Sequence, residues 1–301
     1  MKREIQSKIT WIDIINPKNE ELQILQEKFN LHPILTQELK EPSTRSKIEI
    51  YDHLMFIVYY FSNYNESEKT SEAIEVDFVI TKNTLVTVRY KKYEPIEEVF
   101  ETLQKDPNHQ YLNQSAAHLL YFILESGLIF SLRQLTHIQE KIKDIEKRMF
   151  QGEHKSLIEK IAIVKRDILD QRIIARLQHP ILESLKAKGI NFFGKNLEIY
   201  FNDLLGDYEK LWMSIDNLKE TIESLENTNN TFFESRTNEI IKILTLMAFI
   251  TFPLTLFSSI FSMNTSHTPL VSSPYGFWYI VGLMIVFALV LLIIFKKKKW
   301  F

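Results

Sequence analysis

Two long stretches without a single charge near the end of the chain restrict most strongly what this protein can fold into. Ile243–Phe261 and Phe277–Phe295 are 19 residues each and contain no Lys, Arg, Asp or Glu. A helix that crosses the hydrocarbon core of a bilayer needs roughly 20 apolar residues. The two stretches therefore predict two transmembrane helices. Neither is a signal peptide, because both lie at the C-terminal end and the N-terminal MKREIQSK has no apolar core.

The charges around these stretches predict their orientation. All 38 acidic residues lie at or before Glu239. Lysines 296–299 follow the second stretch, Arg236 and Lys242 precede the first, and residues 262–276 between the stretches have no Lys or Arg. Basic residues concentrate on the cytoplasmic side of a membrane. We therefore expect a multi-pass membrane protein, with the lipid bilayer as its surroundings and both termini in the cytoplasm.

The composition excludes most catalytic chemistry. The chain has no cysteine, which excludes disulfides and thiolate metal sites. Its eight histidines include no pair at i, i+3 or i+4 spacing, and its seven glycines form no phosphate-binding loop. We therefore expect no enzyme activity and no nucleic-acid partner. A metal-dependent hydrolase ranks last among the functions considered, because candidate ligands are not clustered.

The first third of the chain predicts a small α/β domain. Pro17–Phe29 and Pro33–Lys40 each begin with proline and are predicted to be helices. Four runs of strand length are rich in β-branched and aromatic residues and are bounded by polar turns. These runs are KITWIDI (8–14), LMFIVYYF (54–61), EVDFVI (75–80) and TLVTVRY (84–90).

From about Pro95 onward the pattern becomes helical. Residues 119–150 predict one long helix and 156–188 a second, and Gly189 is expected to break the chain before a third. The third helix contains a heptad seam typical of helix packing. The seam consists of Leu204, Tyr208, Leu211, Ile215, Leu218, Ile222 and Leu225.

No polar linker separates this third helix from the first uncharged stretch. One helix from about Asn196 to Phe261 would be roughly 100 Å long at 1.5 Å per residue and would pass from the cytoplasm into the bilayer. We favour this continuous stalk, which can transmit movement. The alternative is an antiparallel bundle helix that packs on its own chain. The residues leave open whether the heptad seam packs within one chain or between copies.

The first uncharged stretch and its approach have one face on which small and polar residues predominate. Its members recur at steps of three and four and lie on one side of a helix. They are Asn238, Ile241, Thr245, Ala248, Phe252, Thr255 and Ser259. The opposite side carries Leu246, Phe249, Ile250, Leu254 and Phe257. Small and hydroxyl-bearing residues also let membrane helices pack closely, but this face leads to Asn264 at the end of the stretch, which favours a pore wall.

Two membrane helices per chain cannot enclose a pore, so a pore requires several copies in a ring. At this point the chain resembles the CorA family of divalent metal ion transporters. The resemblance rests on TNEIIKILTLMAFITFPLTLFSSIFSMN, the short loop, the second stretch and FKKKKWF, and it extends through YFNDLLGDYE, HPILTQEL, RSKIEIYDHLMFIVYY and FVITKNTLVTV. It implies an α+β cytoplasmic domain, a long helical stalk and two C-terminal transmembrane helices in a funnel-shaped homopentamer.

The resemblance implies the following division of the chain. Residues 1–110 are a cytoplasmic α/β domain and 111–239 a helical bundle and stalk. Residues 240–261 are the pore-lining transmembrane helix, 262–276 an external loop with the signature, 277–295 the second transmembrane helix and 296–301 a basic cytoplasmic tail.

The resemblance also implies site residues. The family signature Gly-Met-Asn corresponds to Ser262, Met263 and Asn264, with Asn264 as the selectivity residue at the pore mouth. Mg²⁺ gives up its water reluctantly, so a ring of neutral oxygen acceptors can admit the hydrated ion. Asn238 and Thr255 match further polar pore positions. A regulatory metal is expected between Asp203 of one subunit and Glu38 of the next, holding the ring closed until the metal is depleted.

Two departures from the family pattern concern the pore mouth. Ser262 replaces the signature glycine, and the loop positions that usually carry acids hold Ser266 and Leu270, with His267 between them. We expect transport of a divalent cation, Mg²⁺ first and Co²⁺, Ni²⁺ or Zn²⁺ as alternatives, through a homopentamer gated by cytoplasmic metal. The alternative is a non-conducting, membrane-anchored metal sensor or scaffold that has kept the fold.

Overall fold

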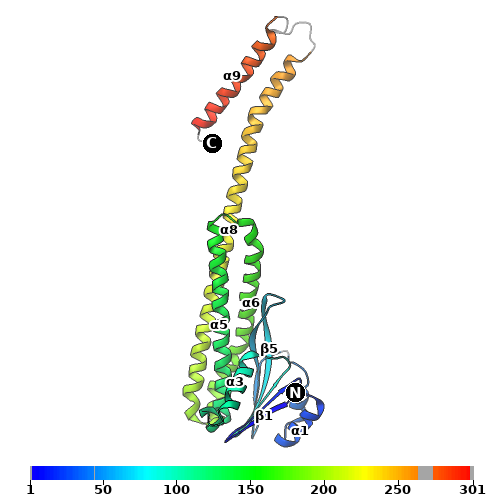
Figure 1. Cartoon of the computed structure of the whole chain (residues 1–301), viewed down its shortest axis with the longest axis vertical. Coiled ribbons are helices and arrows are strands. Elements are labelled where there is room, and N and C mark those ends of the chain that lie inside the picture. The colour runs from blue at the N-terminus through cyan, green and yellow to red at the C-terminus, as the bar shows by residue number, and fades with distance from the viewer. Residues whose placement is uncertain (1, 44, 264–273, 299–301) are drawn as a thin grey trace. The chain divides into compact units, whose positions relative to one another are not determined.

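The structure, a computed structural model, describes residues 2–43, 45–263 and 274–298. The chain forms two compact units, Met1–Asn229 and Asn230–Phe301. The first unit contains a mixed sheet and a helical bundle, and the second contains the end of one long helix together with the last helix (Figure 1).

A six-stranded sheet organises the first unit, with the strand order β1-β2-β6-β5-β4-β3. β2 and β6 are parallel and the other neighbours are antiparallel. The strands are β1 (Lys2–Gln6), β2 (Thr10–Ile15), β3 (Lys47–Ile50), β4 (Met55–Asn65), β5 (Thr70–Ile80) and β6 (Thr84–Arg89). The four predicted strands are confirmed as β2, β4, β5 and β6. The short, polar β1 and β3 were not predicted, because neither has an apolar run of its own.

Both faces of the sheet are covered. Alternate residues of β4 therefore enter two different cores, with Ile57 and Tyr59 in one and Phe56 and Val58 in the other. The helices α1 (Asn19–Phe29) and α2 (Pro33–Glu38) cover the second of these faces, and both were predicted. A strand buried on both faces has no polar side to alternate with, which explains the continuous apolar run at residues 54–61.

A helical layer covers the other face. It comprises α3 (Glu94–Lys105), α4 (Gln110–Asn113), α5 (Ala116–Phe150), α6 (His154–Ser184), the π-turn η1 (Leu185–Gly189), α7 (Ile190–Phe193), the 3₁₀ turn η2 (Lys195–Leu197) and α8 (Glu198–Phe261). The predicted break at Gly189 is wrong, because the backbone stays helical there with φ −65°. The chain turns instead at Gly194, whose φ of 113° favours glycine. Gly189 serves packing, because an added Cβ would lie 3.0 Å from the Phe201 ring.

The long helix is continuous from Glu198 to Phe261, 64 residues including Pro253, which confirms the predicted stalk. Its heptad seam nevertheless packs within the same chain. Leu204, Tyr208, Leu211, Ile215 and Ile222 are buried in the core shared with the helical layer, and Leu218 and Leu225 pack against that core. The first part of α8 therefore packs on its own chain as a bundle helix, while α8 as a whole is one continuous helix.

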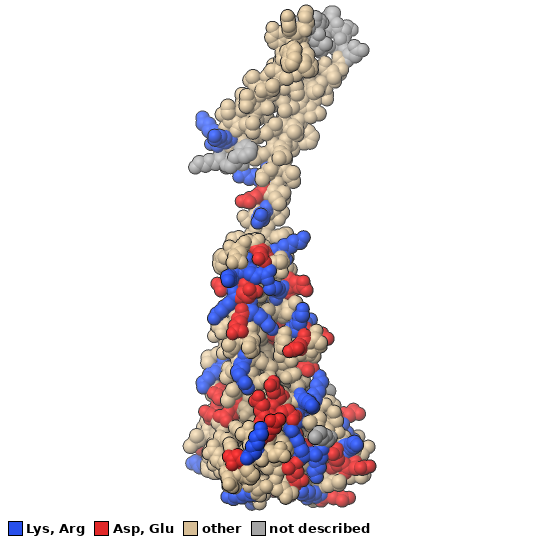
Figure 2. Space-filling model, in the orientation of Figure 1, with Lys and Arg blue, Asp and Glu red and all other residues tan. Residues whose placement is uncertain are grey.

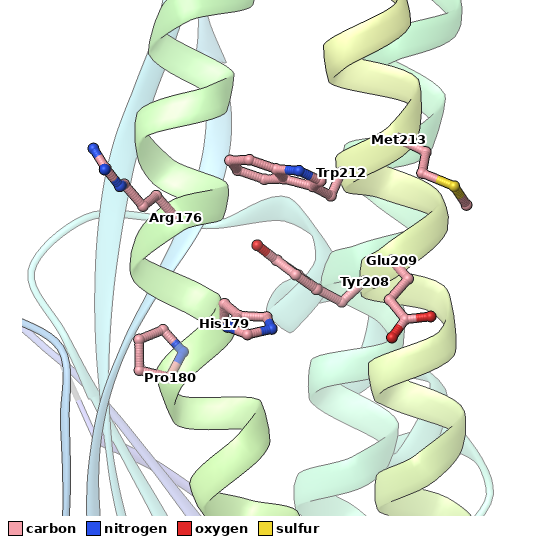
Figure 3. A pocket seen from close by; sticks show the side chains of 7 residues that line it. All are labelled: Arg176, His179, Pro180, Tyr208, Glu209, Trp212 and Met213. Carbon is pink, nitrogen blue, oxygen red and sulfur yellow. The ribbon is translucent and has the colours of Figure 1, made fainter.

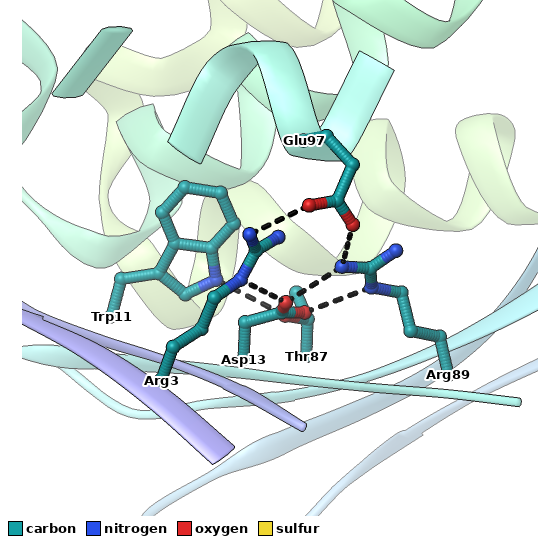
Figure 4. A network of polar contacts seen from close by, with 6 residues as sticks. All are labelled: Arg3, Trp11, Asp13, Thr87, Arg89 and Glu97. Atoms are coloured by element: carbon teal, nitrogen blue, oxygen red, sulfur yellow. Dashed lines mark hydrogen bonds and ion pairs between the residues drawn. The ribbon is translucent and has the colours of Figure 1, made fainter. Parts of the chain in front are cut away.

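A buried polar network fixes α3 to the end of the sheet (Figure 4). Asp13 on β2 accepts hydrogen bonds from Thr87 Oγ1 at 2.6 Å, Arg89 Nη2 at 2.8 Å and Arg3 Nε at 2.8 Å. Glu97 of α3 accepts hydrogen bonds from both arginines. Burial acts to raise the pKa of Asp13, but the hydrogen bonds and charge of Arg89, with those of its other partners, hold the pKa below its usual value. The carboxylate is therefore ionised and structural.

The second unit contains the end of α8 and the helix α9 (Gly276–Lys297). Three helices among the described residues are long and apolar enough to cross a membrane, by length and composition. The apolar part of α5 is 61% buried inside the protein, whereas those of α8 and α9 are 6% and 0% buried. Along α9 and the last turns of α8, the visible face in Figure 2 carries uncharged side chains only, up to the lysines at the end of α9.

Candidate ion pathway and regulatory site

The predicted polar face of α8 is uncovered within the second unit. Phe252 is 74% exposed and Ile241 54% exposed. Asn238, Thr245, Thr255 and Ser259 are also exposed, and Ala248 is half-buried. α9 packs against the other side of α8, where the rings of Phe257 and Phe287 meet edge to face with centroids 5.5 Å apart. In the described part of this unit, α9 therefore leaves the polar face of α8 free.

The hydroxyl groups on this face are oriented by the helix itself. Thr245 Oγ1 donates to the Ile241 carbonyl at 2.7 Å, and Thr255 Oγ1 donates to the Thr251 carbonyl at 2.9 Å. A hydroxyl has one hydrogen and two lone pairs. Because the hydrogen is used inside the helix, the oxygen offers only its lone pairs outward. Such a surface accepts hydrogen bonds from the water shell of a cation.

The helix ends in a tight turn at Ser262 and Met263, which the sequence analysis matched to the family signature. The Ser262 amide donates to the Ser258 carbonyl at 3.0 Å, and the Met263 amide donates to the Ile260 carbonyl at 3.3 Å. Ser262 is not among the residues with positive φ, so it occupies the glycine position without left-handed strain. Met263 is 60% exposed. Asn264 lies outside the described residues, as do Ser266, His267 and Leu270.

Asp203 lies in a small acidic group between α8 and α5. The Tyr121 hydroxyl is within hydrogen-bond distance of Asp203 Oδ2 and Glu125 Oε1, 2.7 Å in both cases. Burial raises the pKa of Glu125, and the negative charges of Asp203 and Asp207 raise it further. The sequence analysis missed Glu125, because only the packing of α5 on α8 brings it to Asp203. Its one sequence signal is its i, i+4 spacing from Tyr121.

Glu38 has different partners in a different layer. It ends α2, on the sheet face opposite the helical layer, and its carboxylate is 2.5 Å from Lys47 Nζ. Lys47 also contacts Glu49, at 3.1 Å. Glu38 and Asp203 therefore do not share a partner within one chain. Among the described residues, no group of three or more His, Asp or Glu side chains is arranged to hold a metal ion.

The first unit also has an open pocket of about 570 Å³ between α6 and α8 (Figure 3). Figure 3 shows Trp212 and Tyr208 of α8 pointing toward Arg176 and His179 of α6. The Trp212 ring also lies 5.2 Å from the Arg172 guanidinium carbon. The pocket is lined mainly by aromatic and aliphatic side chains, with a single carboxylate, Glu209. It therefore lacks the oxygen ligands that Mg²⁺ prefers.

Comparison with known proteins covers nearly the full length. The profile described as CorA-like Mg²⁺ transporter protein matches residues 6–297. The chain is 24% identical to the cobalt/magnesium transport protein CorA of Thermotoga maritima over 97% of this chain and 83% of that one. It is also 24% identical to the protein of that name from Methanocaldococcus jannaschii, over 97% and 92%.

A solved structure shares the fold. The complete CorA magnesium transporter of M. jannaschii matches with a TM-score of 0.86 at 23% sequence identity, over 98% of this chain and 92% of that chain. The α+β domain, the long helix and the C-terminal apolar helix described above therefore form one known architecture.

Proposed function

This chain belongs to the CorA-like Mg²⁺ transporter family, and on that premise we propose that it carries divalent cations, Mg²⁺ first, across the inner (cell) membrane through a pore made by five copies. The family is one of transporters rather than enzymes. The observation that carries the proposal is the uncovered face of α8. The two apolar helices of each chain supply lipid contacts. The polar face of α8, lined by outward-facing hydroxyl lone pairs, has no partner among the described residues of its own unit.

In this proposal Asn238, Ile241, Thr245, Ala248, Phe252, Thr255 and Ser259 line the pathway, and Ser262, Met263 and Asn264 form its outer mouth. A ring of side-chain carbonyls contacts the hydration shell instead of replacing it. The ion then avoids the desolvation that makes charges costly in a membrane. Both termini lie in the cytoplasm, as the positions of Lys242 and the terminal lysines favour.

A ring of identical subunits requires two different surfaces on each subunit, because its contacts are head to tail. The separation of Asp203 and Glu38 supports this arrangement. Asp203 lies beside α5 in the helical layer, and Glu38 lies on the other side of the sheet. A divalent cation between Asp203 of one subunit and Glu38 of the next would neutralise both carboxylates and stabilise one state of the ring. Glu125 is a further candidate ligand, and Lys47 competes with the metal for Glu38.

The test is divalent uptake into proteoliposomes that contain the purified protein and a metal-sensitive dye. Asn264→Ala should abolish uptake of Mg²⁺, Co²⁺, Ni²⁺ and Zn²⁺ while the pentamer persists. Asn217→Ala is the matched control, because it removes an exposed asparagine from α8 outside the proposed pathway and should leave uptake unchanged. Undiminished uptake by Asn264→Ala would contradict the proposal.

The second candidate is a non-conducting metal sensor or scaffold. It is favoured by the loop, which has no acidic residue to concentrate cations above the pore. In that case metal would still protect the protein from proteolysis in a manner that depends on Asp203 and Glu38. None of the four ions would enter the liposomes, even with pentamers confirmed.

A further inference from the structure

Two acidic side chains, Glu75 and Asp77, are buried close together on β5. Glu75 and Asp77 flank Val76 and therefore point to the same face of the sheet. Glu75 is 6% exposed and Asp77 1% exposed. Tyr60 lies opposite Glu75 on β4, and Val88 lies opposite Asp77 on β6. The pair therefore lies in the sheet face that α1 and α2 cover.

The hydrogen-bond donors around the pair do not satisfy it. Glu75 accepts from the Ser43 amide at 2.7 Å and from the Tyr60 hydroxyl at 2.7 Å. Asp77 Oδ2 accepts from the Tyr90 hydroxyl at 3.1 Å, whereas Asp77 Oδ1 is buried without a hydrogen-bond partner. A buried carboxylate oxygen without a donor is costly. A proton held at this oxygen would therefore be stabilising.

The charged groups around the pair add to the negative potential. Glu38 of α2 acts on Asp77, and Lys47 of β3 is the opposing cation. Lys47 itself is paired with Glu38 and Glu49. Among the described residues, the hydroxyls of Tyr60 on β4 and Tyr90 after β6 also face the pair. Lys47 thus acts on three carboxylates at once, those of Glu38, Glu49 and Asp77.

A proton is the occupant that fits. Burial raises the pKa of Asp77 well above its usual value, and the neighbouring charge of Glu75 raises it further. Burial also raises the pKa of Glu75. Two carboxylates that share a buried site cannot both ionise without a counterion, and one shared proton removes the repulsion and supplies the missing donor. Mg²⁺ that is bound by two carboxylates keeps several waters, whereas Glu75 and Asp77 are only 6% and 1% exposed.

We propose that Glu75 and Asp77 form a buried site that holds one shared proton, and that loss of this proton strengthens divalent cation binding at the neighbouring Glu38. The second half rests on the regulatory metal site of the proposed function. The connection is direct in the fold, because the segment that joins Glu38 to β3 is held to Glu75 through Ser43. Deprotonation adds one negative charge near Glu38 and draws Lys47 away from it.

Infrared spectroscopy of the full-length protein in lipid nanodiscs tests the proton site. A protonated carboxyl group has a C=O stretch that ionised carboxylates lack. The wild type should show this band at neutral pH, and Asp77→Asn, which mimics the protonated state, should lose it. Glu72→Gln is the matched control, since Glu72 on the same strand pairs with Lys91 at the surface, and it should keep the band. Absence of the band in the wild type, or its appearance only after cations are removed, would overturn the proton assignment.

The pH dependence of stability provides a second readout. The folded protein binds a proton that the unfolded chain releases near the usual carboxyl pKa of about 4. Stability therefore falls as pH rises from there toward the raised pKa of the pair. Asp77→Asn should flatten this fall, and Glu72→Gln should not. Equal slopes in the wild type and Asp77→Asn would contradict the shared proton.

Mg²⁺-dependent protection from proteolysis tests the connection to Glu38. In the wild type, half-protection should need about fivefold less Mg²⁺ at about pH 8.5 than at about pH 6, a coupling of typical size. Asp77→Asn should need the higher concentration at both pH values, and Glu72→Gln should behave like the wild type. Identical pH responses in the wild type and Asp77→Asn would overturn the connection alone. Absence of Mg²⁺-dependent protection at any pH would overturn both the connection to Glu38 and the proposed regulation. The infrared band would still decide whether Glu75 and Asp77 share a proton.

Discussion

α5 and α9 pass the same test of length and hydropathy, yet their surroundings differ. The apolar part of α5 is 61% buried among the other elements of the first unit, and that of α9 is 0% buried. α5 also carries charged residues along its second half, whereas α9 has none before Lys296. The comparison teaches that mean hydropathy alone does not separate a core helix from a membrane helix. A core helix and a membrane helix are separated instead by whether charge is absent over the full thickness of a bilayer.

The two units also differ in which side chains they bury and which they expose. In the first unit a charge can be fully buried, because partners surround it, as they surround Arg89 and Asp13. In the second unit large apolar side chains are exposed instead, for example Phe277 at 68% and Trp278 at 70%. Exposed apolar surface of this extent marks contact with lipid or with other subunits. The first unit is therefore stabilised from within, and the second by its surroundings.

The largest expected effect tests the internal pairing of the first unit. Asp13→Asn leaves the buried Arg89 with Glu97 as its remaining acidic partner among the described residues, and removal of one partner of a buried ion pair costs about 3–5 kcal/mol. Thermal unfolding followed by circular dichroism should show this loss. Glu239→Gln, an exposed carboxylate of the second unit, should change stability by less than about 0.5 kcal/mol. Similar thermal unfolding midpoints for Asp13→Asn and Glu239→Gln would contradict the contrast between the two units.

The next effect tests the surroundings of the second unit. Val286 of α9 is 60% exposed and Ile158 of α6 is 52% exposed. Arginine in the middle of a membrane helix costs about 2.5–3.5 kcal/mol in insertion, so Val286→Arg should reduce the membrane-inserted fraction strongly. Ile158→Arg faces water and should change neither insertion nor stability by more than about 0.5 kcal/mol. Normal insertion of Val286→Arg would exclude α9 as a membrane span.

The smallest effect compares two glycines. A Cβ on Gly127 of α5 would overlap the Phe61 ring and lie 3.3 Å from the Tyr93 hydroxyl, whereas nothing lies within 4 Å of one on Gly282 of α9. Gly127→Ala should therefore destabilise the first unit by about 1–3 kcal/mol through overpacking. Gly282→Ala should be neutral or stabilising by up to about 1 kcal/mol, since alanine favours helix. Unfolding midpoints of both variants decide this, and an unchanged Gly127→Ala would show that Phe61 moves aside freely.

The sequence predicted those elements whose pattern is local. The two membrane helices, the continuous α8 and the strands β2, β4, β5 and β6 all carry runs that indicate their own structure. β1 and β3 carry no such run, because their pairing with β2 and β4 defines them. The turn at Gly194 was missed because glycine at 189 and at 194 looks the same in sequence, and only packing against Phe201 distinguishes the first.

The residues of the candidate site likewise fall into those that the sequence indicates and those that only the fold reveals. The polar face of α8 follows from helical periodicity, and among the described residues its members are exposed apart from the half-buried Ala248. Asp203 and Glu38 were named through the family resemblance, and the partners of each depend on contacts distant in sequence. Glu125 and the Glu75–Asp77 pair became visible only in the fold, because no pattern of spacing separates them from exposed acids.

By itself, then, the sequence predicted the two long apolar helices and the face of α8 on which small and polar residues gather. The reason is that these depend on side chains a few residues apart on one helix, in a solvent that tolerates no unpaired charge. The tertiary structure alone decided which charges are buried, which acids share a site and where the heptad seam packs. Those properties depend on burial, which sets the electrostatic cost of each charged group. They also depend on partners from distant segments, which offset that cost.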